Sequence, residues 1–536
     1  MHIGRTLART AQRHPGATAL VAPAFGDHSR RELTYRELDS LVDRLDGGLA
    51  ERGIGPGDAV GLFTDNCVEQ VAAYVAVQRL GGVAVPVNHR LAGAELAAIL
   101  DGADAAALLF DTERIDVVAA VRDRLSVDQL VCVDGPEGAN DVPDWATPFS
   151  AVTDAEPPSE KPGADPEALA LSMHTSGTTG TPKLVETTGR AQWANSLACV
   201  GEFGYRSLDV ALNVAPLSHS AGYLNLLLPA IHVGATNVLL RGSFDPETML
   251  RLVDSERATL TLGVPTHFQL LRRAVIDGDV DPAAYDLSSL RTVFTSGAPL
   301  AEDTAAWVAD TLCPSLVNVY GLTETTGLLT VHRWSPDGDD DAGYAIGEPF
   351  LDVEIRLVRP EEDGREVGPH ETVSPGERGH LVARAPKLMT GYRGRPEATA
   401  ATLRDGWLFT GDVAVRRSDG TYALVDRLDN VIVTGGENVY PAEVERVLSD
   451  HPDVLDVAVV GEPDETFGER VAAYVVAERD SGGQLTVDDL TRYWRETRNA
   501  ADFKRPRSIR FVDELPRNSS GKLQRDRIRD DERHSD

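Results

Sequence analysis

The first 150 residues alternate helical segments with short apolar runs, and this alternation constrains the fold more than any other feature of the chain. Residues 33–53 have helical spacing and end at a glycine, and residues 58–63 form a strand-like run. Residues 71–80 again have helical spacing, and residues 81–86 return to a strand-like pattern. Alternation at this pitch predicts βαβ units and a largely parallel sheet.

The rest of the chain divides by composition. Residues 134–166 are rich in Pro, Gly, Asp and Glu, which predicts a surface linker. Dense turn signals over residues 340–430 predict antiparallel β structure. After Asp429, strand and helix patterns indicate a separate α+β unit.

A chain of 536 residues is also too long for one ordinary domain. We therefore predict an α/β fold with a large N-terminal domain, residues 1–428, built of βαβ sub-blocks and a small β-barrel-like sub-block. A small, mobile α+β domain, residues 429–536, is expected to follow it.

The charge balance is strongly acidic, with 84 Asp and Glu residues against 52 Lys and Arg residues and a net charge of −32. Such a surface repels nucleic acid, so we predict no nucleic-acid partner. The same field opposes anionic cofactors unless local cations counter it. The few lysines available for that purpose are Lys161, Lys183, Lys387, Lys504 and Lys522.

The sequence also indicates the compartment. Its four cysteines lie far apart without metal-ligand spacing, a usage that suits a reducing cytosol. The N-terminus lacks the apolar region of a signal peptide. The most apolar stretch, residues 222–240, is interrupted by polar residues and proline, so we expect core rather than a membrane span. These features predict a cytoplasmic protein without membrane insertion.

The strongest local motif is HTSGTTGTPK at residues 174–183. Glycine and hydroxyl-bearing residues allow backbone N–H groups and hydroxyls to converge on phosphate oxygens, and Lys183 adds a positive charge. A Walker A loop has glycine directly before its lysine and Ser or Thr after it, whereas Pro182 and Leu184 flank this lysine. The motif therefore predicts a phosphate-binding loop of another kind.

At this loop the chain resembles the adenylate-forming superfamily of acyl- and aryl-CoA synthetases, adenylation domains and beetle luciferases. Further matches follow in the order typical of that family and extend the resemblance over nearly the whole chain. They comprise TSGAPL at 295–300, YGLTE at 320–324, TGD at 410–412, DRLD at 426–429, GGEN at 435–438 with PAE at 441–443, and the terminal PRNSSGK at 516–522.

The resemblance implies binding sites for ATP and Mg²⁺. The residues implied to hold the nucleotide are Thr175, Ser176, Gly177, Thr178, Thr179, Gly180, Lys183, Ser296, Gly297, Ala298, Pro299, Tyr320, Gly321, Thr323, Asp412 and Arg427. Glu324 is implied to hold Mg²⁺, a hard cation that takes carboxylate and phosphate oxygens. Asp412 is implied to accept hydrogen bonds from the ribose hydroxyls, and Tyr320 to stack on adenine.

The resemblance also implies which residues act in catalysis. Lys522 would bridge the substrate carboxylate and the α-phosphate, where a positioned cation lowers the repulsion between two anions. Thr175, Glu324 and His219 are the other catalytic candidates. His219 lies in the PLSH segment, residues 216–219, and either contacts the acid or is a satisfied core histidine. Asp429 is implied to be the hinge of the small domain.

Coenzyme A is the third cofactor that the resemblance implies. Gly435 and Gly436 would let a loop approach the pantetheine arm, because glycine has no Cβ. Phe467, Phe503 and Arg505 would contact the CoA nucleotide, although the two phenylalanines are equally well explained as core of the small domain.

We therefore expect an AMP-forming acid–CoA ligase that acts on a small carboxylic acid, either aryl or short-to-medium acyl. The alternative is a stand-alone adenylating enzyme that passes the acid to a separate carrier-protein thiol or to an amine-type nucleophile. A non-catalytic binder is disfavoured because the motif lysines and carboxylates are intact. A homodimer is a possible assembly. The sequence departs from the family pattern at Leu184, Glu186 and Asn430.

Overall fold

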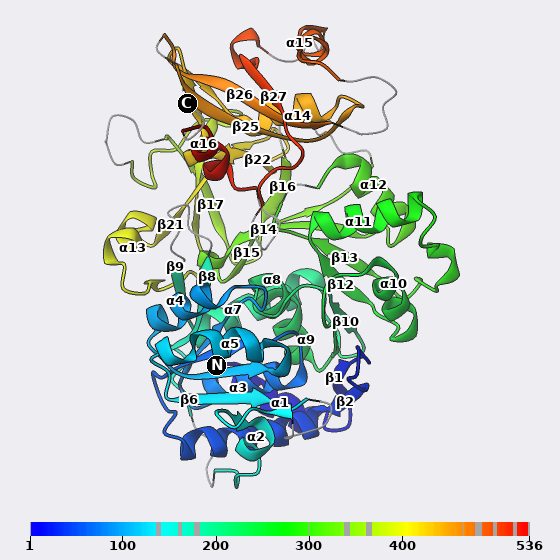
Figure 1. Ribbon diagram of the computed structural model, residues 1–536, viewed down its shortest axis with the longest axis vertical. Coiled ribbons are helices and arrows are strands. Elements are labelled where there is room, and N and C mark those ends of the chain that lie inside the picture. Colours follow the sequence, from blue (N-terminus) through cyan, green and yellow to red (C-terminus); the bar gives the residue numbers. More distant parts are fainter. Residues whose placement is uncertain are drawn as a thin grey trace. The chain divides into compact units, whose positions relative to one another are not determined.

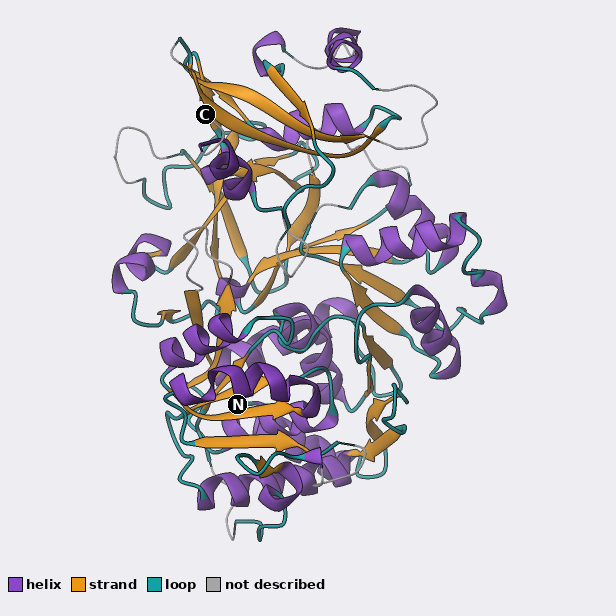
Figure 2. Cartoon of the chain, in the orientation of Figure 1, coloured by secondary structure: helices purple, strands orange, loops and turns teal. Residues whose placement is uncertain are grey.

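The chain forms two compact units, which we call unit 1 (residues 1–338, 347–354 and 383–408) and unit 2 (residues 339–346, 355–382 and 409–536). The structure is a computed structural model, and its elements are labelled in Figure 1 and coloured by type in Figure 2. The boundary expected between residues 428 and 429 stays a prediction. The residues described are 2–135, 141–158, 163–175, 183–298, 300–336, 344–360, 367–464, 466–477, 485–496, 501–517 and 523–533.

Unit 1 contains an eight-stranded sheet with the order β19-β9-β8-β4-β3-β5-β6-β7. Its strands are β3 (Ala59–Phe63), β4 (Val83–Pro86), β5 (Ala105–Asp111), β6 (Gln129–Val133), β7 (Thr147–Pro148), β8 (Leu169–Thr175), β9 (Lys183–Thr188) and β19 (Gly391–Tyr392). Strands β8, β4, β3, β5 and β6 are parallel, and β9 is antiparallel to β8. The predicted βαβ organisation of the first 150 residues is confirmed.

Helices cover this sheet, and their sequences explain where they begin and what they bury. They are α1 (Ile3–Arg13), α2 (Tyr35–Glu51), α3 (Val68–Arg79), α4 (Gly93–Ala103) and α5 (Ile115–Val121). Helix α2 starts at a capping box, in which Thr34 and Glu37 exchange side-chain and backbone hydrogen bonds. Helix α3 is buried on every side, which explains its lack of a polar face. Its terminal Arg79 is buried against Asp39 and Asp43 at 2.8 and 2.6 Å.

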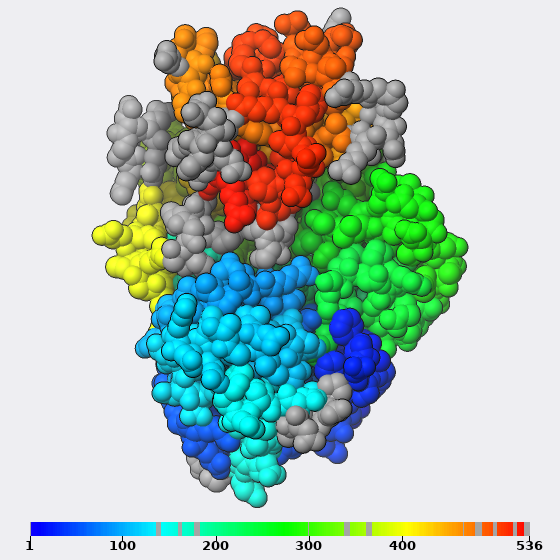
Figure 3. Space-filling view, viewed as in Figure 1, coloured from blue at the N-terminus to red at the C-terminus, as the bar shows by residue number. Residues whose placement is uncertain are grey.

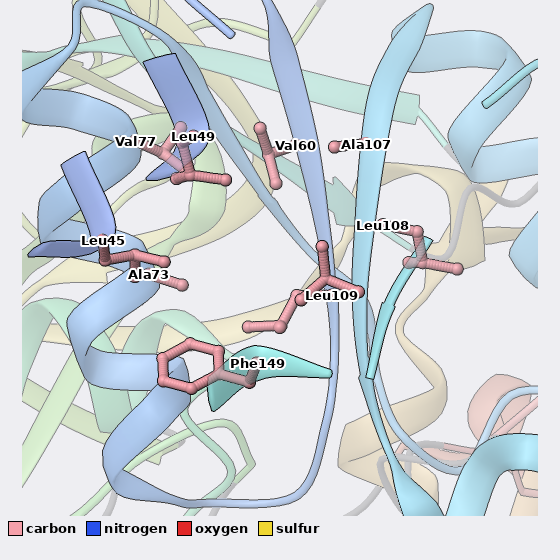
Figure 4. Close-up of a pocket in the computed structure, with 10 residues that line it drawn as sticks. Leu45, Leu49, Val60, Ala73, Val77, Ala107, Leu108, Leu109 and Phe149 are labelled. Carbon is pink, nitrogen blue, oxygen red and sulfur yellow. The ribbon is translucent and has the colours of Figure 1, made fainter. Parts of the chain in front are cut away.

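A small apolar cavity of about 20 Å³ lies in the core between this sheet and helices α2 and α3. Leu45 and Leu49 of α2 and Ala73 and Val77 of α3 line one side, and strand residues such as Leu109 line the other (Figure 4). The cavity offers no polar group to a ligand, because its exposed surface is entirely apolar. We interpret it as a packing void and not as a substrate site.

The second sheet of unit 1 has the order β15-β14-β13-β12-β10-β11-β1-β2. Its strands are β1 (Thr18–Ala22), β2 (Arg31–Thr34), β10 (Val210–Asn213), β11 (Thr236–Leu239), β12 (Leu260–Gly263), β13 (Thr292–Thr295), β14 (Leu316–Leu322) and β15 (Gly327–Arg333). The six strands from β14 to β1 are parallel. Helices α10 (Pro246–Ser255), α11 (Pro265–Ile276) and α12 (Glu302–Thr311) form the green surface in Figure 3. A buried π-helical turn (Tyr223–Leu227) continues into α9 (Leu228–Val233).

Unit 2 is smaller and begins with the predicted antiparallel β structure. Strands β17 (Glu354–Val358), β18 (Arg378–Arg384), β21 (Trp407–Arg416), β22 (Tyr422–Arg427) and β16 (Tyr344–Pro349) are neighbours in this order. The pairing of β21 with β22 is antiparallel.

A five-stranded sheet follows in unit 2, with the order β24-β23-β26-β25 and β27 beside β26. Its elements are β23 (Ile432–Thr434), β24 (Glu437–Val439), α14 (Pro441–Ser449), β25 (Val454–Asp464), β26 (Gly468–Ala477), α15 (Val487–Glu496), β27 (Ser508–Phe511) and α16 (Arg525–Arg533). These strands and helices agree with the α+β pattern predicted after Asp429. The predicted α/β fold, with a large N-terminal part and a smaller C-terminal one, is confirmed as well.

No helix among the described residues combines the length and the apolarity needed to cross a bilayer.

Candidate active site

Three predicted site segments in unit 1 lie at the ends of neighbouring parallel strands. Residues 216–219 come after β10, residues 296–298 follow β13, and residues 321–324 span the end of β14 and the turn after it. Between β10 and β13, residues 264–267 follow β12 in the same way. Because the carboxyl ends of parallel strands meet at one edge of a sheet, these segments share that edge. Ligands of open α/β sheets bind at such an edge, so this is our candidate active site.

The ends of the predicted phosphate loop lie side by side on a strand pair. Thr175, the last residue of β8, is the register partner of Lys183, the first residue of β9. The intervening residues Ser176, Gly177, Thr178, Thr179 and Gly180 lie outside the described residues, as does Pro299 of the second nucleotide loop. The Lys183 ammonium group lies 4.9 Å from the ring centroid of Tyr392, which is a cation–π contact.

The end of β14 and the turn that follows it have a fixed backbone. A Cβ at Gly321 would stand 2.1 Å from the Gly327 carbonyl oxygen, so only glycine fits there. The Thr325 hydroxyl accepts the Leu322 N–H at 3.0 Å and lies 2.7 Å from the Gly327 carbonyl oxygen. Tyr320 pairs with the adjacent strand. These contacts fix the backbone on either side of Thr323 and Glu324 and so hold both residues at the candidate site.

Glu324 is partly buried and is oriented by the segment that carries Tyr392. The Tyr392 hydroxyl donates a hydrogen bond to Glu324 Oε1 at 2.9 Å. The Met389 N–H also donates to the Glu324 carbonyl oxygen at 2.8 Å. Sequence reasoning missed Tyr392, because a single tyrosine between glycine and arginine residues carries no signal of a contact with Glu324.

The chemistry of Glu324 suits magnesium. Among the described residues, no three His, Cys, Asp or Glu side chains cluster to form an all-protein metal site. Mg²⁺ needs no such cage, since it is commonly held by one or two carboxylates together with substrate phosphates. The single carboxylate of Glu324 is therefore suited to the predicted role of a magnesium ligand.

Two histidines near the site are held neutral. Burial lowers the pKa of His174 to about 4, and its Nε2 accepts the Asn88 N–H at 3.3 Å. Desolvation also lowers the pKa of His219, although the residue as a whole is exposed. His219 Nδ1 accepts the Ala221 N–H at 3.2 Å, so the ring proton is on Nε2. His219 is thus no sealed core residue, and its Nε2–H is a donor.

In unit 2, the TGD motif lies on β21 beside the end of β22. Asp412 is buried, and its Oδ1 lies 3.3 Å from the Arg427 guanidinium. The Gly411 N–H donates to His380 Nε2 at 2.9 Å, a contact that sequence reasoning missed because residues 380 and 411 lie on different strands. The pair predicted to bind ribose and phosphate is therefore brought together.

The hinge motif is organised by Asp426. Its carboxylate accepts hydrogen bonds from Asn430 Nδ2 at 2.8 Å and from the Ala442 N–H at 2.7 Å. Asn430 departs from the family pattern, and the structure explains it as a donor to this carboxylate. Asp429 is exposed beside it. Its role as a hinge stays a prediction, and Lys522 lies outside the described residues.

The residues predicted to contact coenzyme A are at the surface of unit 2. Gly435 has a left-handed φ of 61°, and a Cβ there would lie 3.3 Å from the Phe467 ring. Phe467 and Phe503 are 54% and 39% exposed, which argues against the alternative that they are core. Arg505 forms an ion pair with Asp502 at 3.2 Å. Gly436, also with a left-handed φ, completes the loop.

Comparisons with known proteins extend these observations. The AMP-binding enzyme family matches residues 7–393, and the AMP-binding enzyme C-terminal domain matches residues 443–522. The chain is 38% identical to a feruloyl-CoA synthase from Amycolatopsis over 98% of each chain.

Two solved structures are also similar. The anthranilate CoA ligase AuaEII in complex with anthranoyl-AMP superposes with a TM-score of 0.84 and 26% identity, over 99% of this chain and 97% of that one. The amide bond synthetase McbA from Marinactinospora thermotolerans superposes with a TM-score of 0.83 and 30% identity, over 98% of this chain and 99% of that one. The family match spans well over half of the sequence, and both of its domains are present in order. The chain therefore belongs to the AMP-binding enzyme family.

Proposed function

We propose that this AMP-forming acid–CoA ligase activates an aryl carboxylic acid. The observation that carries the proposal is the 38% identity to feruloyl-CoA synthase over nearly the full length of both chains. The anthranilate CoA ligase, a second relative named for an aryl acid, supports the same substrate class. The alternative acceptors, a carrier-protein thiol or an amine, are not favoured, because the relative at 38% identity over nearly the full length of both chains is named for a CoA product, whereas the amide bond synthetase is 30% identical.

The first half-reaction joins the acid to AMP. A carboxylate oxygen of the acid attacks the α-phosphorus of ATP, the bond to the bridging oxygen breaks, and pyrophosphate leaves. Lys183 neutralises phosphate charge, and the hydroxyls of Thr175 and Thr323 hold phosphate oxygens. Lys522 stabilises the negative charge that builds at phosphorus. Glu324 would hold Mg²⁺, which would supply positive charge to the phosphate oxygens.

Nucleotide recognition uses side chains of complementary chemistry. Tyr320 stacks on adenine, and Ser296, Gly297 and Ala298 form the adjacent loop. Asp412 accepts hydrogen bonds from the ribose hydroxyls, because a carboxylate offers two neighbouring acceptor oxygens. Arg427 holds Asp412 in place and adds positive charge.

The second half-reaction transfers the acyl group to coenzyme A. The thiol sulfur attacks the activated carbonyl carbon, the bond to the AMP oxygen breaks, and the thiol proton goes to solvent. In this proposal the small domain rotates about Asp429 and withdraws Lys522 between the two steps. Gly435 and Gly436 give the pantetheine arm access. Phe467, Phe503 and Arg505 bind the CoA nucleotide.

His219 is proposed to bind the acid. Its Nε2–H is a neutral donor, which can hydrogen-bond the substrate carboxylate without a strong ion pair that would hold the nucleophile back. A neutral donor also agrees with the pKa that desolvation lowers.

The proposal is tested by screening aryl and aliphatic acids with ATP, Mg²⁺ and CoA, with pyrophosphate and thioester measured in parallel. We expect acids of the ferulate and anthranilate kind to give both products in equal amounts. Exclusive activity on aliphatic acids would refute the substrate class. Pyrophosphate without thioester, together with an amide when an amine is supplied, would instead favour the alternative acceptor.

A further inference from the structure

The segment around Tyr392 touches two parts of the candidate site that lie far apart in the sequence. Its ring lies beneath the Lys183 ammonium group, 4.9 Å from centroid to Nζ. Its hydroxyl donates to Glu324 Oε1 at 2.9 Å. One side chain thus contacts both the lysine expected at the phosphates and the carboxylate expected at the metal.

From this geometry we propose that Tyr392 is a positioning residue, which orients Glu324 toward Mg²⁺ through its hydroxyl and holds Lys183 through its ring. The inference rests on the proposed function, because it assigns a role to a residue that supports the same ATP site.

The backbone around Tyr392 is anchored on both sides, which makes a positioning role physically effective. Strand β19, which carries Tyr392, pairs with β9, which begins at Lys183. The Thr390 N–H donates to the Glu186 carbonyl oxygen at 2.8 Å, and the Arg393 side chain pairs with the Glu186 carboxylate at 3.1 Å. Glu186, a departure from the family pattern, therefore fastens the segment to β9.

The other side of the segment is fastened to the loop that follows β14. The Met389 N–H donates to the carbonyl oxygen of Glu324. Tyr392 itself is only 7% exposed, and its ring packs with Val185 and Leu408. A ring held on all sides loses little conformational entropy when its hydroxyl binds a carboxylate, so the hydroxyl can fix the Glu324 rotamer.

The hydroxyl fixes one carboxylate oxygen and leaves the other for the metal. Groups of this kind, which hydrogen-bond a metal ligand without touching the metal, typically change metal affinity or activity by about 10–100-fold when removed. We therefore expect the effect of Tyr392 to appear in how strongly Mg²⁺ tightens ATP binding.

The test is a calorimetric titration of the full-length protein with ATP, in the absence of acid, once with Mg²⁺ and once with EDTA. The ratio of the two dissociation constants, which we call the magnesium coupling, is independent of turnover. Tyr392→Phe keeps the ring and loses the hydroxyl, so the coupling should fall about tenfold while ATP affinity in EDTA is unchanged. Tyr392→Leu also loses the ring, so ATP affinity in EDTA should fall by roughly two- to fivefold.

The matched control is Tyr35→Phe, which removes another buried tyrosine hydroxyl of unit 1. The Tyr35 hydroxyl donates to the Ala235 carbonyl oxygen at 2.6 Å, away from the candidate site. This variant should lose a similar amount of stability and keep the wild-type coupling. Should Tyr392→Phe fail to fold, Tyr392→His serves as the second variant, because its shorter side chain cannot reach Glu324 and should show the same loss.

A double-mutant comparison separates positioning from general damage. In Glu324→Gln the coupling should already be lost, so adding Tyr392→Phe should cause no further loss. A wild-type coupling in Tyr392→Phe, or an equal loss in Tyr35→Phe, would overturn the inference and leave the proposed function standing. If ATP binding to the wild-type protein does not depend on Mg²⁺, both the inference and the proposed function are overturned.

Discussion

The ion pair between Lys387 and Asp352 gives a prediction whose size follows from burial. The Lys387 side chain is fully buried, its Nζ lies 2.8 Å from Asp352 Oδ1, and it also lies 4.4 Å from the Phe350 ring centroid. The Asp352 side chain is 21% exposed. Removing either partner leaves the other charge behind, so the two single variants should differ in cost.

Asp352→Asn should be the more damaging change. It leaves an ammonium group with no access to water, and an uncompensated buried charge costs about 3–5 kcal/mol of unfolding free energy. Lys387→Met leaves a carboxylate that still reaches solvent, so we expect a loss of about 1–2 kcal/mol. The double variant Lys387→Met/Asp352→Leu removes both charges and should lie close to the wild type.

The assay is urea unfolding of each variant, followed by a signal assigned to unit 1, at several pH values. Burial lowers the pKa of Lys387, so the unfolded chain binds more protons than the folded one between the folded and unfolded pKa values. Stability should therefore rise with pH in that alkaline window. In Asp352→Asn the pKa of Lys387 should fall further, because Asp352 raises it, so the pH range over which stability rises should extend to lower pH. A larger loss of unfolding free energy in Lys387→Met than in Asp352→Asn would show that access to solvent does not set the cost of the unpaired charge.

Three further predictions concern catalysis and pH. Lys522→Ala should abolish adenylation and spare thioester formation from supplied adenylate; equal loss of both steps in rapid-quench assays would refute the assigned role. Asp429→Pro should do the reverse, because a fixed φ blocks rotation, and normal overall turnover would count against a hinge. His174 and His267 each have a pKa lowered to about 4 by burial, so the unfolded chain takes up more protons between pH 6.5 and 4. The unfolding free energy should fall by up to about 3 kcal/mol per histidine as pH drops through this window. Chemical denaturation at pH 7 and pH 4.5 measures this fall, with His174→Gln as the comparison. An unfolding free energy that does not change between the two pH values would contradict the prediction.

Much of the fold was predictable because its signals are local. Strands of the βαβ region are short apolar runs between helical segments, and this alternation predicts a parallel sheet. The edge shared by the segments ending at His219 and Glu324 was not predicted, because it depends on the order of the strands within the sheet. The small α+β unit was equally predictable, since its turn and helix signals lie within a few residues of each element.

Contacts between distant segments were not predictable. Tyr392 and Glu324 are 68 residues apart, and nothing in the sequence near Tyr392 indicates that its hydroxyl meets a carboxylate. The burial of Lys387 was also not predictable. An isolated lysine is normally exposed, and the pairing with Asp352 explains why this one is buried. Phe467 was ambiguous because core and ligand-binding phenylalanines look alike in sequence; its exposure argues against a core role, and its contact with coenzyme A stays a prediction.

We propose that this chain joins an aryl acid to coenzyme A through an acyl-adenylate. The most direct measurement is the product stoichiometry of the purified enzyme with ATP, Mg²⁺, CoA and an acid such as ferulate, followed by mass spectrometry. We expect equal amounts of AMP, pyrophosphate and aryl-CoA, with aryl-AMP accumulating when CoA is left out. Formation of ADP and phosphate, or of aryl-CoA without AMP, would contradict it.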